Sequence, residues 1–236
     1  MNTSLILKAL LFELWYTFRV FTFIMIHNMI ISKLWVYKIH GEEVEMEYVE
    51  PIRNKKQIET LKKILKSSNL RDYCLFTLGI NSGLRISDLL QLKIRDVMDV
   101  DGNIRDRITL REIKTNKTKN FPMSSVASKC IQEYLLSRSF HHEEPLFLSN
   151  KQVDGLSSIK RQQAYRIIND AARQIGISEK IGTHTLRKTF GYHAYKASVP
   201  IEIIQKLFNH STPGTTLRYI GITQDDLDSV YLNLNL

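Results

Sequence analysis

The sequence contains few cysteines. Cys74 and Cys130 are the two among 236 residues, and neither belongs to a CxxC motif or a Cys/His pair. Such a set cannot form a disulfide framework or a zinc site of the usual spacing. Both lie in apolar periodic segments, so we expect buried free thiols, which fit a reducing, intracellular compartment.

A long uncharged apolar run is also missing. Residues 1–39 are rich in large apolar side chains, but Lys8, Glu13 and Arg19 interrupt them. The uncharged run from Val20 to Ser32 is shorter than the ~20 residues that cross a bilayer, and no small-residue cleavage site follows it. Three interpretations of residues 1–39 therefore remain: an amphipathic interface helix, a packing helix, or translated sequence upstream of the true start. A membrane-anchored protein is the outlying alternative.

The acidic stretch from Gly41 to Pro51 is typical of a linker closed by proline. Met46, within it, opens sequence that is ordinary for a globular domain. We therefore expect an atypical extension and linker over residues 1–50, followed by one domain over residues 51–236.

Acidic residues are outnumbered. The chain has 33 Lys+Arg against 24 Asp+Glu, a formal net charge of +9 and a pI near 9.5. This surplus favours polyanionic partners, nucleic acid before anionic membranes, although an ordinary basic surface would have the same composition. Charge indicates the class of partner and not the chemistry.

Hydrophobic periodicity predicts a mainly α-helical domain with a small antiparallel β-sheet (α+β) and no internal repeat. The first helix starts at Asn54, which can form a capping box with Gln57, and the second ends at Gly83. Alternating β-branched residues predict strands. The expected helices are 54–65, 70–82, one from Ser87, 125–138, 161–175, 184–197, one opened by Pro200, 213–220 and 224–233, with strands over 107–113 and 120–124.

Five short motifs stand out in the second part of the chain. GLRISDLLQL carries Arg85 just after a glycine turn, and IKTNKTKNFP forms a basic hairpin. HTLRKTF carries His184 and Arg187 on one face of a helix. FNH carries His210 at a helix end, and TTLRY carries Tyr219 nine residues later.

In this order and at these separations, the motifs resemble those of the tyrosine recombinases, which include phage integrases and Xer resolvases. The resemblance covers about residues 50–236. It implies the catalytic-domain fold of DNA breaking-rejoining enzymes and site-specific recombination or integration of double-stranded DNA. It further implies a 3′-phosphotyrosyl intermediate, no metal or other cofactor, no small-molecule substrate and a cytoplasmic location.

Phosphodiester chemistry explains the residue types. Attack on phosphorus adds charge to the non-bridging oxygens, and two forked guanidiniums, Arg85 and Arg187, can hold them. Tyr219 would be the nucleophile, and its phenol, with an ordinary pKa near ~10, needs help to lose its proton. The resemblance implies that His184 accepts or relays this proton and that His210 donates to a phosphate oxygen.

The hairpin supplies the predicted general acid. Lys114 begins the pattern K-x-x-K-x-x-x-x-P that the family's hairpin shares, so the resemblance implies that it protonates the leaving 5′ oxygen. Lys117 and Lys119 are then expected to contact the DNA backbone, although a neighbouring hairpin lysine could be the acid. Asp88, one helical turn after Arg85, matches the acidic residue that orients this arginine.

Further basic residues lie in the segment 157–173, SSIKRQQAYRIINDAAR, near the start of a predicted helix. We expect Lys160, Arg161 and Arg166 to contact phosphates, since most contacts to DNA go to the backbone. A solvated charged face is the alternative. The sequence leaves open whether three more residues contact phosphates: Thr183, Lys188 and Arg218.

The terminal segment 223–236 places Leu227, Val230 and Tyr231 on one face of a helix. Family resemblance implies that this helix docks on a neighbouring protomer, which would make the chain a homo-oligomer on DNA. Docking on its own domain is the alternative.

Two features depart from the family pattern. Phe208-Asn209-His210 stands where LGH is usual, so the packing around His210 is expected to differ. The segment before Pro51 is too short and too apolar to be the family's core-binding domain, so an accessory DNA-binding protein is a further expected partner. A type IB topoisomerase and a non-catalytic, integrase-derived DNA-binding regulator remain alternative functions.

Overall fold

The computed structural model describes residues 49–149 and 156–234. The predicted extension, and the linker up to residue 48, lie outside the described residues. Among the described helices, none is both long enough and apolar enough to span a bilayer.

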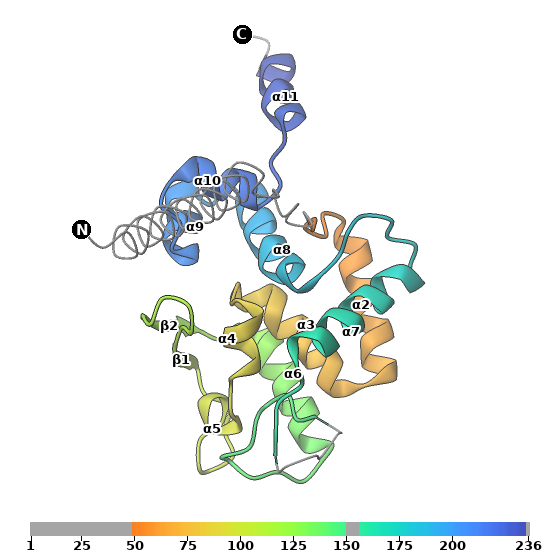
Figure 1. Cartoon of the computed structure of the whole chain (residues 1–236), viewed down its shortest axis with the longest axis vertical. Coiled ribbons are helices and arrows are strands. Elements are labelled where there is room, and N and C mark those ends of the chain that lie inside the picture. The colour runs from red at the N-terminus through yellow and green to blue at the C-terminus, as the bar shows by residue number, and fades with distance from the viewer. Residues whose placement is uncertain (1–48, 150–155, 235–236) are drawn as a thin grey trace, which may run out of the picture. The chain divides into compact units, whose positions relative to one another are not determined.

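The described part is mainly helical, with one two-stranded antiparallel sheet (Figure 1). The elements in chain order are α2 (Lys55–Ser68), α3 (Leu70–Ser82), α4 (Ile86–Leu90), α5 (Ile94–Val97), β1 (Arg107–Arg111), β2 (Thr118–Pro122), α6 (Ser125–Leu136), α7 (Arg161–Gln174), α8 (Thr183–Lys196), α9 (Ile201–Phe208), α10 (Pro213–Tyr219) and α11 (Gln224–Leu234). This confirms the predicted fold class and, within one or two residues, most helix bounds.

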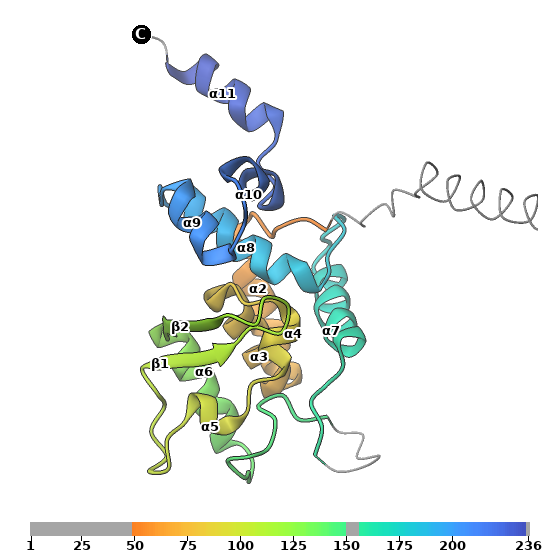
Figure 2. The same cartoon turned by 60° about the vertical axis from the view of Figure 1, so that its left-hand side comes forward.

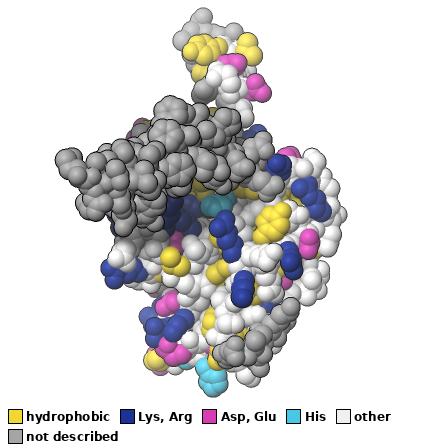
Figure 3. Space-filling view, in the orientation of Figure 1, with side chains coloured by type: hydrophobic (Ala, Val, Ile, Leu, Met, Phe, Trp, Pro, Cys, Tyr) yellow, Lys and Arg dark blue, Asp and Glu magenta, His cyan; other side chains and the backbone are white. Residues whose placement is uncertain are grey.

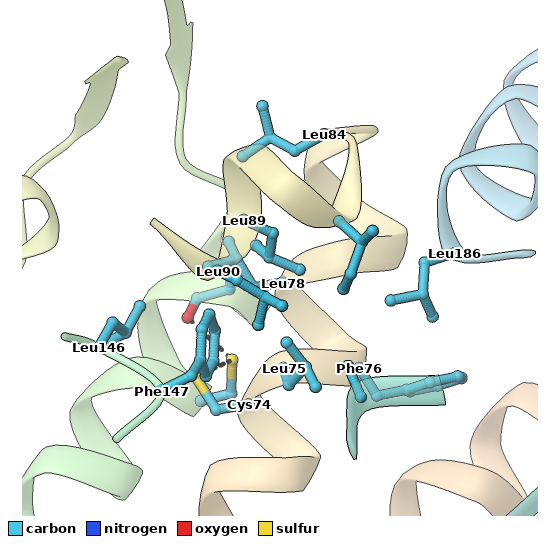
Figure 4. Close-up of a cluster of buried hydrophobic side chains, with 14 of the residues drawn as sticks. Cys74, Leu75, Phe76, Leu78, Leu84, Leu89, Leu90, Leu146, Phe147 and Leu186 are labelled. Carbon is cyan, nitrogen blue, oxygen red and sulfur yellow. Dashed lines mark hydrogen bonds between the residues drawn. The ribbon is translucent and has the colours of Figure 1, made fainter. Parts of the chain in front are cut away.

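The main hydrophobic core is built around α3, which packs on α2, α6 and α8. Figure 4 shows Leu75, Leu78 and Phe147 inside this cluster. Cys74 and Cys130 are both buried and free, as predicted, and their sulfur atoms lie 3.9 Å apart. The core holds the end of α3, and therefore the Arg85 turn, in a fixed place.

Gly83 ends α3 in the left-handed conformation, with φ +60°. A Cβ there would lie 2.6 Å from the ring of Phe190 on α8, so both the backbone angle and the space require glycine. The chain therefore turns sharply beneath α8, and Arg85 follows as the N-cap residue of α4.

The hairpin bounds differ from the prediction. Five residues of each strand pair, from Arg107 opposite Pro122 to Arg111 opposite Thr118. Glu112 and Ile113 were expected to continue the first strand, and the second strand was expected to begin only at Asn120. Instead, the amide of Ile113 donates to Asp88 Oδ1 at 2.9 Å, so side-chain contacts end the first strand early.

A second, smaller hydrophobic cluster joins α8, α9 and α10 around Ile204, Phe208 and Ile220. Figures 1 and 2 show these three helices grouped on one side of α3 and α4. At Gly191 a Cβ would meet Ile220 at 2.6 Å and Phe208 at 2.7 Å, so α8 lies in close contact with its neighbours. The motif residues of α8, α9 and α10 are thereby brought together.

Helix α11 follows α10, and Val230 and Tyr231 on it lie in solvent. Val230 is 57% exposed and Tyr231 is 84% exposed, whereas the side chain of Leu227 lies outside what the structure describes. Lys196 Nζ contacts Asp226 Oδ1 at 3.2 Å and ties the first turn of α11 to α8.

Candidate active site

Arg85 lies between two buried carboxylates. Its Nη1 atom is 2.8 Å from Glu112 Oε1 and 3.8 Å from Asp88 Oδ2, and the carboxylate side chains are 0% exposed. The Arg85 side chain keeps 17% of its surface in solvent. Its Nη1 atom is therefore held by the protein, and the remaining guanidinium N–H groups are the donors that an approaching anion can use.

Arg187 is 2% exposed and bridges the ends of two helices that are far apart in sequence, α3 and α9. Nη1 donates to the carbonyl of Gly83 at 2.7 Å, and Nη2 donates to the carbonyl of Phe208 at 2.8 Å. The guanidinium also lies 4.3 Å from the centre of the Phe208 ring. Burial lowers the pKa of Arg187 to about 10, so the side chain stays cationic at neutral pH.

The Tyr219 hydroxyl lies 3.4 Å from His184 Nδ1. Burial raises the pKa of Tyr219 above its ordinary value, against the opposing effect of the Arg187 and Arg85 charges and a hydrogen bond with Arg187. The phenol is therefore protonated at neutral pH, and its reaction as a nucleophile requires a proton acceptor.

His184 is the ionisable side chain in contact with this hydroxyl, and its tautomer decides whether Nδ1 can accept the phenol proton. Burial and the nearby charges of Arg161 and Lys188 lower its pKa, so the imidazole is neutral at pH 7. Its Nε2 atom lies 3.4 Å from Arg161 Nη2. A guanidinium only donates, so this contact places the imidazole proton on Nδ1, and Arg161 must move away before Nδ1 can accept the phenol proton.

His210 lies beside the same tyrosine, with 4.9 Å between the two ring centres. Burial and the charges of Arg187 and Arg85 lower its pKa to about 4. Its Nδ1 atom is 3.1 Å from the hydroxyl of Thr216, which itself donates to the carbonyl of Thr212 at 3.2 Å. The proton of the neutral His210 ring therefore lies on Nδ1. For Nε2 to donate to a phosphate, the ring must either gain a second proton when the anion binds or exchange tautomer as the Thr216 hydroxyl rotates to donate to Nδ1.

The hairpin lysines divide into two groups. Lys114 and Lys117 are exposed on the turn between β1 and β2. Lys119 is half-buried, and its Nζ donates to the carbonyl of Leu207 at 3.2 Å. Burial and the charge of Arg187 lower the pKa of Lys119 to about 8. The structure therefore brings Lys119, rather than Lys114, close to the arginines.

Two residues of the site have positions that the sequence did not predict: Lys188 was considered only as a candidate phosphate contact, and Glu112 only as part of the first strand. Lys188 is 5% exposed, and its ammonium lies 5.4 Å from the centre of the Tyr219 ring. Its position four residues after His184, on the same helical face, was the available signal. Glu112 continues the buried alternation of Ile108 and Leu110, and a carboxylate in such a position needs a partner.

A basic face surrounds the site. Lys160, Arg161 and Arg166 are all exposed at the start of α7. Figure 3 shows lysine and arginine side chains around a histidine on one face of the molecule. Within residues 49–149 and 156–234, no cluster of three or more His, Cys, Asp or Glu residues could hold a metal ion.

Comparison with known proteins gives a consistent result. The profile of the phage integrase family matches residues 53–225. A Bacillus subtilis protein named "Probable integrase/recombinase YoeC" is 42% identical over 186 residues, which cover 79% of this chain and 97% of that protein. The tyrosine recombinase XerC of Pelobacter propionicus is 34% identical over 163 residues, covering 69% of this chain and 51% of XerC.

A solved structure shows the same fold. The crystal structure of XerA recombinase superposes with a TM-score of 0.62 at 24% sequence identity, covering 80% of this chain and 65% of XerA. The chain thus spans nearly all of YoeC but only about half of XerC.

Proposed function

We propose that this chain, which belongs to the phage integrase family of tyrosine recombinases, cleaves and rejoins double-stranded DNA through a covalent bond to Tyr219. One observation carries this assignment. The Tyr219 hydroxyl lies beside a neutral imidazole and two arginines, on three elements (α4, α8 and α10) that the chain brings together from residues 85 to 219. A nucleophile, a base and an anion-binding pair are the parts that phosphoryl transfer needs.

The proposed cleavage step is a transesterification. The Tyr219 oxygen forms a bond to phosphorus as the bond from phosphorus to the 5′ oxygen breaks, which leaves a 3′-phosphotyrosyl link and a free 5′ hydroxyl. His184 takes the phenol proton, and a lysine gives a proton to the leaving oxygen. Arg85, Arg187 and His210 hold the non-bridging oxygens, so charge is stabilised without a metal.

A suicide DNA substrate tests this function. A nick placed next to the scissile phosphate lets the short 5′ fragment diffuse away, so the covalent adduct accumulates. We expect this adduct to form in the presence of EDTA. Cleavage that stops completely on chelation would instead indicate a metal-dependent nuclease.

The general acid can be identified by changing the leaving group. We propose Lys114 as the acid, brought to the phosphate by the hairpin, and Lys119 as a residue that fixes the hairpin to α9. Lys114→Ala should slow adduct formation about 10²-fold to 10⁴-fold. A substrate with sulfur in place of the leaving 5′ oxygen needs no proton, so it should restore the rate of this variant.

Lys119→Ala is the matched control for this test. We expect a smaller loss of rate for it, and no selective rescue by the sulfur substrate. Selective rescue of Lys119→Ala, with none for Lys114→Ala, would transfer the role of general acid to Lys119, whose pKa of about 8 suits proton donation.

We further propose that the cations of α7 contact phosphates and that α11 docks on a second copy of the chain. In mobility-shift titrations on a duplex with two half-sites, Lys160→Ala/Arg166→Ala should bind at least about 10-fold more weakly and with a shallower salt dependence. Deletion of residues 223–236, which carry the exposed Val230 and Tyr231, should leave binding to one half-site and abolish cooperative occupation of two. Unchanged affinity in the α7 variant would contradict the proposed phosphate contacts, and unchanged cooperativity in the deletion would contradict the proposed docking of α11.

Because the proposed substrate is cellular DNA, we propose that the chain acts in the cytoplasm. An accessory DNA-binding partner remains part of this proposal.

A further inference from the structure

Glu112 makes three side-chain contacts at the end of β1. Oε1 accepts from Arg85 Nη1 at 2.8 Å, and Oε2 accepts from the Thr115 hydroxyl at 2.6 Å and from Asn209 Nδ2 at 3.1 Å. The residue is 1% exposed. A buried carboxylate with donors on both oxygens holds these donors in fixed relative positions.

The three donors come from distant parts of the chain. Arg85 opens α4, Thr115 lies in the hairpin turn, and Asn209 ends α9 immediately before His210. The backbone of Glu112 also closes the hairpin turn, because its amide donates to the carbonyl of Lys117 at 2.9 Å. A single side chain thus connects the lysine hairpin, an arginine of the site and the His210 turn.

Asn209 adopts the left-handed conformation, with φ +53°, at the end of α9. Glycine is the usual residue in this conformation, and asparagine is the next most tolerated. Glycine would offer no side-chain donor, whereas the amide of Asn209 reaches Glu112 across 97 positions of sequence. Asparagine in place of the glycine of the LGH motif therefore adds a hydrogen bond to Glu112 that glycine could not make.

Asp88, the carboxylate predicted to orient Arg85, does not replace Glu112. Its Oδ1 atom accepts from the amide of Ile113 at 2.9 Å, and its Oδ2 atom lies 3.8 Å from Arg85 Nη1. Among the described residues, Oδ2 is buried without a hydrogen-bond partner. Glu112 accepts the direct hydrogen bond from the guanidinium, whereas Asp88 adds negative charge and holds the hairpin turn.

We infer that Glu112 is a positioning residue for DNA cleavage, which orients Arg85 and, through Asn209, sets the hairpin and the His210 turn against it. This inference rests on the proposed function. Glu112 does not contact the phosphate, since both of its oxygens are occupied by protein donors. It acts by holding Nη1 of the guanidinium, which leaves the remaining N–H groups as donors for the phosphate.

The test uses the full chain and the suicide DNA substrate at saturating DNA. Glu112→Gln should slow adduct formation about 10-fold to 100-fold, with the DNA dissociation constant within about 3-fold of wild type. Asn209→Asp places two carboxylates together and should slow adduct formation about 100-fold. The double variant Glu112→Gln/Asn209→Asp restores a donor facing an acceptor, with one negative charge, and should recover most of the rate lost by Asn209→Asp.

Two matched controls accompany these variants. Asn209→Gly removes the amide without strain at φ +53°, so it should show a smaller loss than Asn209→Asp. Glu143→Gln removes a carboxylate that pairs with Lys93 and Arg95 but is 63% exposed, and it should cleave at the wild-type rate. Thermal unfolding of each variant separates slow cleavage from loss of the folded chain.

Recovery in the double variant would support the inference, since a general loss of stability would not be reversed by a second substitution. A Glu112→Gln chain that cleaves within 2-fold of wild type, or a double variant no faster than Asn209→Asp alone, would overturn it. A wild-type chain that forms no adduct would overturn the proposed function, and this inference with it. Active wild type with fully active Glu112 variants would overturn the inference alone.

Discussion

Replacing Tyr219 with phenylalanine should reduce the covalent protein–DNA adduct below detection and leave the fold intact. The substitution removes the nucleophilic oxygen but keeps the ring, which packs 5.7 Å from Phe208 and 4.9 Å from His210, centre to centre. The hydroxyl lies 3.4 Å from His184 Nδ1 and also hydrogen-bonds the Arg187 guanidinium, so its loss should lower the free energy of unfolding by about 1–3 kcal/mol. Denaturing gels with labelled DNA measure the adduct, and urea titration measures stability.

Other tyrosines supply the controls for this experiment. Tyr192→Phe and Tyr195→Phe change tyrosines on α8, and Tyr231→Phe changes one that is 84% exposed on α11. Each should form adduct at the wild-type rate. An adduct that persists in Tyr219→Phe but disappears in one of these variants would assign the nucleophile to that residue instead.

The helices were largely predictable because local signals agreed with tertiary packing. The predicted end of α3 at Gly83 was confirmed, since a left-handed φ of +60° is most easily adopted by glycine. Asn54 caps α2 as predicted, but its side chain accepts from the amide of Lys56 at 2.8 Å, and the expected capping box with Gln57 is not formed. The short helix α5 was missed because four residues are too few to show a period.

The predicted end of the first strand, β1, was wrong because of contacts with residues that are distant in sequence. RITLREI alternates over seven residues, yet pairing stops at Arg111. Glu112 turns to the Arg85 guanidinium, and the amide of Ile113 donates to Asp88. These partners lie 25 or more positions away in sequence, so no local pattern could reveal them.

The motif residues of the site were predictable because each motif combines a reactive side chain with the local element that presents it. Arg85, His184, Arg187, His210 and Tyr219 come together as the predicted active site requires. Their partners were harder to predict. The Thr216 contact with His210 and the Asn209 contact with Glu112 depend on rotamers and on packing between elements. Catalytic roles remain a prediction that the adduct experiments test.

Replacing Arg187 with lysine should slow adduct formation about 10³-fold and also destabilise the fold. The guanidinium satisfies the carbonyls of Gly83 and Phe208 at 2.7 Å and 2.8 Å and still has donors for a phosphate. A single ammonium on a shorter reach cannot serve both carbonyls and the phosphate. Loss of one transition-state donor typically costs about 10²-fold to 10³-fold in rate. The buried carbonyl left unpaired should cost about 1–3 kcal/mol in the free energy of unfolding.

Single-turnover cleavage at saturating DNA and urea titration measure the two effects separately. Arg95→Lys, at a side chain that is 53% exposed on α5 and outside the proposed DNA-binding surface, is the matched control and should change neither by more than about 2-fold or 0.5 kcal/mol. An Arg187→Lys chain that is destabilised but cleaves at the wild-type rate would make Arg187 a purely structural bridge between the α3 turn and the end of α9. A chain that is as stable as wild type but inactive would instead show that its carbonyl contacts contribute little, and that its charge and fork are required at the phosphate.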